Sequence, residues 1–197
     1  RAAKRVLDII VSGLGIIVSS PIMLIIAIAV KAYDGGPVFY LQDRLTYQGK
    51  EFRIRKFRSM CVDSEKNGAR LASKHDSRIT PVGHVLRNLH LDELPQLFNV
   101  FMGDMSLVGP RPERDVIMQE YEQEIPEFHY RLKVKAGLTG YAQVMGNYNT
   151  SFLDKLKWDL MYIENYSLFL DFKILLMTAI AIFAKDNHED FSKWDML

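Results

Sequence analysis

The chain has 197 residues, 48% of them hydrophobic, and a formal net charge of +1. This length and apolar content are enough for one sizeable core, so we expect a single domain over residues 1–197. The near-neutral charge excludes the strongly basic surface that neutralises nucleic-acid phosphates, so we expect no nucleic acid among the partners. The single cysteine, Cys61, excludes an internal disulfide.

An uncharged, mostly apolar stretch runs from Ile9 to Val30. A helix needs about 20 such residues to cross the hydrocarbon core, so residues 1–33 are predicted to be a membrane segment. Pro21 lacks a backbone N–H and predicts a kink or a break of this helix at Ser20-Pro21. The hydroxyl groups of Ser19 and Ser20 can satisfy the carbonyls that the proline frees.

The topology of this segment has two readings. Both flanks are basic, with Lys4 and Arg5 before the stretch and Lys31 after it. The positive-inside rule favours keeping both flanks cytoplasmic, as in a re-entrant helix that turns back at the proline. An ordinary kinked transmembrane helix fits the same residues equally well, and membrane lipid is a predicted partner in both cases.

Residues 34–197 contain no repeat, no low-complexity tract and no long polar linker. Short strands are predicted at Val38–Leu41 and Phe52–Phe57, with a hairpin around Tyr47–Lys50. A helix is predicted to open at Asp92 and to stop at Gly103. Its apolar residues recur with helical spacing and predict one core-facing side: Leu94, Leu97, Phe98 and Phe101.

Two further helices are predicted near the C-terminus. Leucine and isoleucine recur with helical spacing from Leu153 to Ile163, among charged residues, which is typical of an amphipathic helix. The segment Phe169–Ala184 has an apolar run too short for a second span, so we expect a helix that lies in the membrane interface.

Asp92 and Glu93 are the first candidates for chemistry. Two adjacent carboxylates at a positive helix end can remain ionised, bind a divalent cation and place an oxygen for attack on phosphorus. Acidic residues are also common at helix starts, so a plain capping role is the alternative.

Basic residues around this pair suggest a phosphate clamp. Arg58 and Arg87 offer the bidentate fork that suits phosphate oxygens, and Lys56 offers a point charge. Ordinary surface charge is the competing interpretation.

The turn Pro110-Arg111-Pro112 is a third candidate. Two prolines stiffen the backbone around Arg111 and reduce the entropy that is lost when it holds an anion. A rigid structural turn explains the same residues.

Seven sequence blocks in this order resemble the catalytic domain of the bacterial sugar transferase family, the monotopic phosphoglycosyl transferases. The blocks are residues 4–8, 20–21, 36–40, 56–60, 91–99, 103–112 and 162–167. The resemblance implies an α+β, mostly helical fold. It would contain a re-entrant membrane helix broken at Ser20-Pro21, interfacial amphipathic helices, and a small α/β catalytic part within residues 34–197.

By this resemblance the protein is an enzyme of the cytoplasmic face of the bacterial inner membrane. It would transfer a sugar 1-phosphate from a UDP-sugar to undecaprenyl phosphate with Mg²⁺ and release UMP. Asp92 would be the nucleophile that forms an aspartyl phosphosugar, and Glu93 would bind the metal or manage protons.

The resemblance also assigns binding residues. Lys56, Arg58 and Arg87 would hold phosphates, Pro110, Arg111 and Pro112 would contact the nucleotide, and Asp92 and Glu93 would ligate Mg²⁺.

The branch of the family, the donor sugar and the oligomeric state are also expected from the resemblance. The stretch from Gly146 to Thr150, with Glu113-Arg114, looks most like the exopolysaccharide and capsule branch, so we expect UDP-glucose or UDP-galactose as donor. The larger members imply a homodimer. The alternative function is a non-catalytic membrane scaffold of a polysaccharide assembly complex, because amphipathic helices suit that role equally.

Overall fold

The computed structural model describes residues 2–64, 76–146 and 150–183. They divide into two compact units, which are described separately. The first unit contains residues up to 44 together with 51–105, and the second contains residues 45–50 together with those from 106 onward. The single domain predicted for residues 1–197 stays a prediction.

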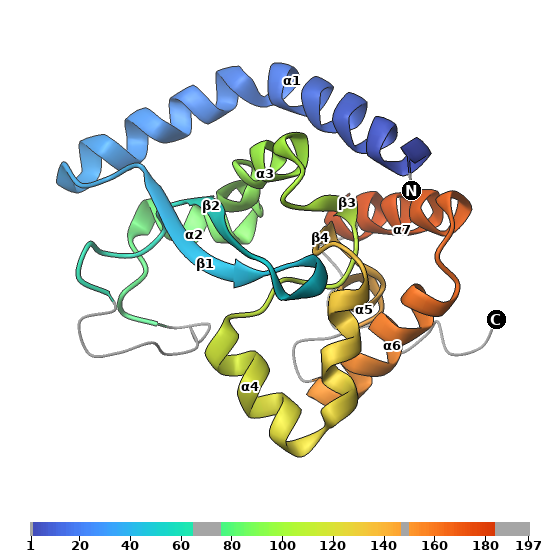
Figure 1. Cartoon of the computed structure of the whole chain (residues 1–197). Coiled ribbons are helices and arrows are strands. Elements are labelled where there is room, and N and C mark those ends of the chain that lie inside the picture. Colours follow the sequence, from blue (N-terminus) through green and yellow to red (C-terminus); the bar gives the residue numbers. More distant parts are fainter. Residues whose placement is uncertain (1, 65–75, 147–149, 184–197) are drawn as a thin grey trace. The chain divides into compact units, whose positions relative to one another are not determined.

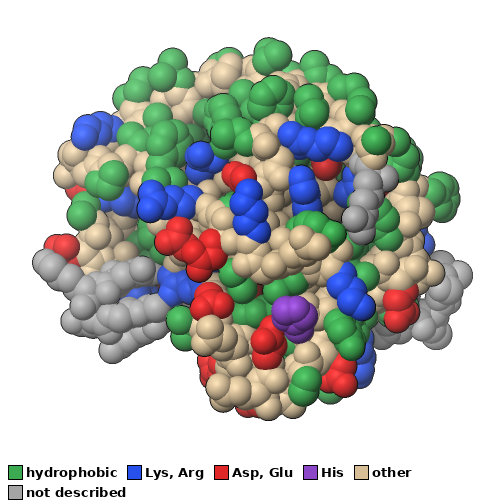
Figure 2. Space-filling model, in the orientation of Figure 1, with side chains coloured by type: hydrophobic (Ala, Val, Ile, Leu, Met, Phe, Trp, Pro, Cys, Tyr) green, Lys and Arg blue, Asp and Glu red, His purple; other side chains and the backbone are tan. Residues whose placement is uncertain are grey.

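The first unit begins with α1, a helix of 33 residues from Ala2 to Asp34. Among the described residues it is the one helix long and apolar enough to cross a membrane. Large apolar side chains remain exposed along it, including Val18 at 79% and Ile17 at 70%. Figure 2 shows hydrophobic side chains gathered along this helix at the top of the view. This exposure is typical of a helix that anchors a protein in a membrane.

The structure corrects one detail of this helix, the break predicted at Ser20-Pro21. Helical structure continues through Pro21 to Asp34, and the α1 ribbon is arched rather than interrupted (Figure 1). Pro21 cannot donate to the carbonyl of Ile17, and the Ser20 hydroxyl donates to that oxygen instead, at 2.8 Å. The Ser19 hydroxyl donates to the carbonyl of Gly15 at 2.6 Å. The prediction is confirmed for Ser20, which satisfies the carbonyl that Pro21 frees, whereas Ser19 binds a carbonyl that the proline does not free. With the carbonyl of Ile17 satisfied, the helix bends without ending.

The predicted strands and hairpin are confirmed. β1 (Phe39–Leu45) and β2 (Glu51–Phe57) pair in a two-stranded sheet. The connection contains the 3₁₀ turn η1 (Tyr47–Gly49), where Gln48 and Gly49 have positive φ.

Two α-helices and a 3₁₀ turn complete the first unit. They are α2 (Pro81–Asn88), η2 (Leu91–Glu93) and α3 (Gln96–Met102). The helix that was predicted to open at Asp92 therefore begins as a 3₁₀ turn and becomes α-helical at Gln96. Its predicted stop is confirmed, because Gly103 takes the left-handed conformation, φ 95°.

The core-facing side of α3 is more polar than predicted. Its buried residues are Gln96, Asn99 and Val100, whereas Phe98 and Phe101 are 37% and 44% exposed. The apolar spacing misled the prediction because two amides occupy interior positions.

The membrane helix α1 holds the end of α3. The Arg5 guanidinium donates to the carbonyls of Val100 and Phe101, each at 2.7 Å. These carbonyls lie in the last turn of α3, where they lack partners within the helix and where a cation is favoured. Helix α3, which follows Asp92-Glu93 in the chain, is thus hydrogen-bonded to the membrane helix α1.

The second unit contains a small parallel sheet and several helices. β3 (Ser106–Val108) pairs with β4 (Gly137–Thr139), with Ser106 opposite Gly137. The helices are α4 (Asp115–Glu124), η3 (Pro126–Lys133), α5 (Tyr141–Met145), α6 (Phe152–Glu164) and α7 (Leu168–Phe183). Their core includes Leu45, Met118, Phe128 and Leu156.

Both C-terminal helices that the sequence predicts are present as α6 and α7. Phe169, Phe172 and Ile180 on α7 are 81%, 59% and 63% exposed. Such an apolar face suits a membrane interface, and the interfacial placement of α7 stays a prediction. Ala184, the last residue predicted for this helix, lies outside the described residues.

Candidate active site

Asp92 lies buried in the first unit, with 9% of its surface exposed. It is the middle residue of η2, a turn that begins directly after His90, whose backbone is left-handed with φ 53°. Burial raises the pKa of the Asp92 carboxyl above its ordinary value, while the positive charges of Lys56 and Arg87 act in the opposite direction. Asp92 is therefore a desolvated carboxyl that nearby cations help to ionise, which is a usual setting for a reactive acid.

Glu93 is joined to strand β2 by an ion pair. The Lys56 ammonium lies 2.6 Å from Glu93 Oε1, and each side chain is 19% exposed. This contact brings together one residue of the predicted phosphate clamp and both predicted catalytic carboxylates, because Lys56 also acts electrostatically on Asp92.

Arg87 approaches the same carboxylates from α2. Its Nε donates to the Ser59 hydroxyl at 2.9 Å, and its charge lowers the pKa of Asp92. Arg87 is half-buried, and a phosphate contact for it stays a prediction.

Arg58 makes different contacts from Lys56 and Arg87. Its guanidinium forms an ion pair with Asp34 at the end of α1, with Nη1 2.6 Å from Oδ2. Its Nε donates to the carbonyl of Pro37 at 2.7 Å, and the side chain is 7% exposed. These bonds anchor the end of the membrane helix, and a phosphate contact for Arg58 stays a prediction.

Asn99, which was not among the predicted site residues, fixes α3 against β2. Its Oδ1 accepts a hydrogen bond from the Arg55 backbone N–H at 3.0 Å, and its Nδ2 donates to the Arg53 carbonyl at 2.8 Å. Asn99 is fully buried. Because β2 also carries Lys56, Asn99 helps to set the strand beside the carboxylate pair. An amide inside an apolar helical pattern was the available signal.

Asn99→Ala is expected to reduce the free energy of unfolding. The substitution leaves two backbone groups without partners, at a cost of about 1–3 kcal/mol each. Chemical unfolding in detergent measures this loss. The control Asn88→Ala removes an exposed amide, and its effect is expected within about 0.5 kcal/mol. Equal effects of the two substitutions would contradict the role assigned to Asn99.

The carboxylate pair is also the predicted magnesium site. Within residues 2–64, 76–146 and 150–183, no group of three or more His, Cys, Asp or Glu side chains gathers in a way that could hold a metal. Mg²⁺ commonly uses one or two carboxylates and completes its shell with water and substrate phosphates. Asp92 and Glu93 fit this sparse mode, because their carboxylates supply hard oxygen ligands.

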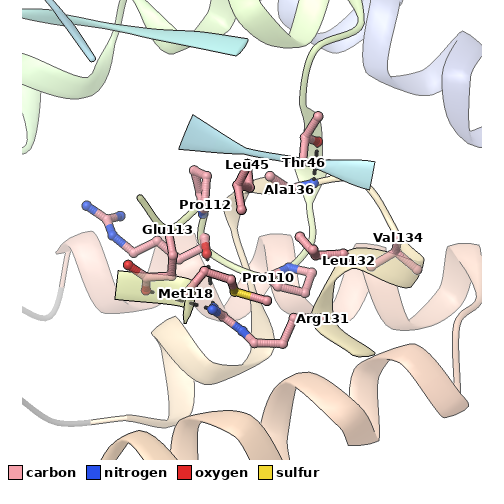
Figure 3. A pocket seen from close by; sticks show the side chains of 11 residues that line it. Leu45, Thr46, Pro110, Pro112, Glu113, Met118, Arg131, Leu132, Val134 and Ala136 are labelled. Carbon is pink, nitrogen blue, oxygen red and sulfur yellow. Dashed lines mark hydrogen bonds and ion pairs between the residues drawn. The ribbon is translucent and has the colours of Figure 1, made fainter. Parts of the chain in front are cut away.

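The Pro-Arg-Pro turn belongs to the second unit. Pro110, Arg111 and Pro112 border a small pocket in this unit (Figure 3). The Arg111 side chain is exposed, and Pro112 is buried. The pocket is also lined by Leu45, Thr46, Glu113, Met118, Arg131, Leu132, Val134 and Ala136.

A buried ion pair behind this turn was not predicted. The Arg131 Nε donates to Asp159 Oδ2 at 2.7 Å, and the two side chains are 7% and 1% exposed. Arg131 Nη2 donates to the carbonyl of Arg111 at 3.0 Å. No spacing rule links an arginine in η3 to an aspartate in α6, so the sequence offered no local signal.

Comparison with known proteins gives consistent matches. A family model described as bacterial sugar transferase matches residues 1–185. The chain is 46% identical over 182 residues to the UDP-N-acetylgalactosamine-undecaprenyl-phosphate N-acetylgalactosaminephosphotransferase of Aeromonas hydrophila, covering 91% of this chain and 43% of that protein. It is 45% identical over 181 residues to the UDP-glucose:undecaprenyl-phosphate glucose-1-phosphate transferase of Klebsiella pneumoniae, covering 89% and 39%.

A third relative is closer to this chain in length. The UDP-glucose:undecaprenyl-phosphate glucose-1-phosphate transferase of Caulobacter vibrioides is 39% identical over 189 residues, covering 93% of this chain and 71% of that protein. The chain spans less than half the length of the Aeromonas and Klebsiella relatives. Since the family model covers nearly all of the sequence and these relatives align along it, the chain belongs to the bacterial sugar transferase family.

Proposed function

We propose that this chain catalyses transfer of a sugar 1-phosphate from a UDP-sugar to undecaprenyl phosphate. The observation that carries this proposal is the buried Asp92 carboxyl beside Lys56, Glu93 and Arg87. The names of the relatives, which act on UDP-sugars and undecaprenyl phosphate, support the same reaction.

The proposed chemistry has two displacements at one phosphorus. A carboxylate oxygen of Asp92 attacks the β-phosphorus of the UDP-sugar, the bond to the bridging oxygen breaks, and UMP leaves with that oxygen. A phosphate oxygen of the lipid then attacks the aspartyl phosphosugar, which forms the lipid diphosphate sugar and frees the carboxylate. Two successive visits to one site avoid direct repulsion between two anionic substrates.

The basic side chains suit both displacements. Lys56 and Arg87 favour the ionised, nucleophilic form of Asp92, and the same charges can hold the phosphoryl oxygens during each step. Bound Mg²⁺ would neutralise phosphate charge, with Asp92 and Glu93 as the protein ligands. Glu93, which Lys56 holds, acts as the metal or proton partner of Asp92.

The proposal extends to the topology of α1 in the membrane. We place both ends of α1 on the cytoplasmic face of the bacterial inner membrane, with α1 as a re-entrant helix. The basic residues Arg5 and Lys31 on its two flanks, and the bend that Ser20 supports at Pro21, favour this placement. The active site would then lie at the level of the lipid headgroups, where the phosphate of undecaprenyl phosphate is found.

Pro21→Ala is expected to restore the missing backbone hydrogen bond, straighten α1 and move one end of the helix across the membrane. Accessibility labelling of cysteines introduced at the two ends measures this, in a background where the exposed Cys61 is replaced by alanine. Val18→Ala, a change at an exposed apolar position, is the control and leaves both ends cytoplasmic. Unchanged labelling of Pro21→Ala would show that the proline does not determine the topology.

The donor sugar and the oligomeric state complete the proposal. We propose UDP-glucose or UDP-galactose, and a homodimer in the membrane for exopolysaccharide or capsule synthesis. Relatives are named for glucose, galactose and N-acetylgalactosamine, and residues 147–149 of the stretch that suggested the exopolysaccharide branch lie outside the described residues.

Release of UMP tests the function. Protein in nanodiscs is supplied with undecaprenyl phosphate, Mg²⁺ and UDP-glucose, UDP-galactose or UDP-N-acetylgalactosamine in turn. We expect lipid-dependent UMP release with one of these donors. Folded protein that turns over none of them would favour the non-catalytic scaffold instead.

A further inference from the structure

Two successive backbone carbonyls of the Pro-Arg-Pro turn accept hydrogen bonds from other segments of the second unit. The Gly137 N–H donates to the carbonyl of Pro110 at 2.9 Å. Arg131 Nη2 donates to the next carbonyl, that of Arg111, at 3.0 Å. Proline fixes φ at positions 110 and 112 and restricts the residue before it. These two carbonyls belong to the peptide groups on either side of the Arg111 Cα, so the two hydrogen bonds together fix the direction in which the Arg111 side chain leaves the backbone.

Arg131 is itself held in one orientation. Its Nε is bound to Asp159, its Nη1 lies 3.8 Å from Glu113 Oε1, and its guanidinium stacks 4.7 Å from the centre of the Phe128 ring. Figure 3 shows the Arg131 head beside Glu113, below Pro110 and Met118. With 7% of its side chain exposed, Arg131 has little room for another rotamer.

Stability alone is a weak explanation for this pair. Two buried charges lose their hydration, and an apolar pair of similar volume is often as stable. Asp159 also has one oxygen, Oδ1, that is buried without a hydrogen-bond partner among the described residues. What an apolar pair could not supply is a donor aimed at the carbonyl of Arg111.

We infer that Arg131, oriented by Asp159, is a positioning residue that fixes Arg111 for binding the diphosphate of the nucleotide donor. The inference rests on the proposed function and on the predicted contact of the exposed Arg111 with the nucleotide. Arg131 does not touch the substrate, and it acts through the backbone of the turn.

Arg131→Lys is the sharpest test, because lysine keeps the charge beside Asp159 but cannot donate to Asp159 and Arg111 with the same fork. We expect KM for the UDP-sugar to rise about tenfold, the loss expected for one such hydrogen bond. The KM for undecaprenyl phosphate should stay within about twofold, because the inferred role concerns the donor alone. UMP binding by calorimetry should weaken in parallel with donor KM.

A double-mutant cycle distinguishes a positioning role of Arg131 from a general disturbance of the fold. If Arg131 acts through Arg111, Arg131→Lys should have little further effect in an Arg111→Lys background. Arg78→Lys is the matched control, since Arg78 is also paired, with Asp76 at 2.6 Å, but belongs to the first unit. It should leave both KM values unchanged.

The outcomes distinguish the two proposals. Absence of UMP release by the wild-type chain refutes the function, whereas normal wild-type turnover with an unchanged donor KM in Arg131→Lys refutes positioning alone. Additive effects in the cycle, or equal changes of both KM values, also overturn it. If Arg131→Lys does not fold, Asp159→Asn carries the same test, because it loosens the guanidinium and should also raise donor KM selectively.

Discussion

Asp92→Asn is expected to lower UMP release by at least about a thousandfold, the scale seen when a covalent nucleophile is removed. The amide keeps the shape of the side chain but offers no anionic oxygen to attack phosphorus. Turnover with saturating UDP-sugar, lipid phosphate and Mg²⁺ measures the loss. Asp115→Asn, which changes an exposed carboxylate of the second unit, is the control and keeps wild-type turnover.

The same substitution should not destabilise the fold. Burial raises the pKa of Asp92 above 3.8 in the folded state, so the folded state binds this proton more tightly than the unfolded state. Stability then falls as the pH rises from the unfolded pKa through the folded pKa, and at neutral pH the buried charge is a cost. Asp92→Asn should unfold at the same or a higher temperature in detergent with a chelator present. Near-normal UMP release would contradict the assignment of Asp92 as nucleophile.

Gly83→Ala is expected to have the largest effect on folding. At an exposed position inside a helix, alanine is more stable than glycine by about 1 kcal/mol. At position 83, however, a Cβ would overlap the Ser59 carbonyl oxygen and lie 2.6 Å from the carbonyl carbon. These are backbone atoms, so no rotamer change relieves the overlap. Helix α2 must move away from Ser59, which breaks the hydrogen bonds of Ser59 with Thr80 and Arg87.

We expect Gly83→Ala to lose at least about 2 kcal/mol of unfolding free energy, as overpacked sites do, and to lose activity because α2 carries Arg87. Gly13→Ala is the matched control. Its Cβ would lie 3.4 Å from a ring carbon of Phe101, which is close to ordinary contact. Chemical unfolding of both variants in detergent measures the difference. Equal unfolding free energies of the two variants would show that α2 can shift away from Ser59 at little cost.

The membrane helix illustrates what local sequence can predict. An uncharged stretch predicts α1, and the missing N–H of Pro21 predicts a distortion within it. The predicted break was too strong, because the hydroxyl of Ser20 replaces the lost donor at Ile17. Short-range chemistry of this kind is visible in a sequence, but its outcome depends on the rotamer that the serine adopts.

The candidate site shows where such prediction ends. The carboxylate pair and its basic neighbours were identified by residue type and family resemblance. The pairing of Lys56 with Glu93, and the use of Arg58 as an anchor for Asp34, depend on tertiary contacts between distant segments. The Arg131–Asp159 pair was missed for the same reason, because no period or spacing connects the two residues.

Trapping the covalent intermediate shows whether Asp92 is the nucleophile. The protein is mixed with Mg²⁺ and a UDP-sugar labelled in its β-phosphate, without undecaprenyl phosphate, and its peptides are examined by mass spectrometry. We expect a sugar phosphate on the peptide that contains Asp92, release of UMP in equal amount, and discharge of the label when the lipid phosphate is added. Turnover without any labelled enzyme, or label on a residue other than Asp92, would contradict this role of Asp92.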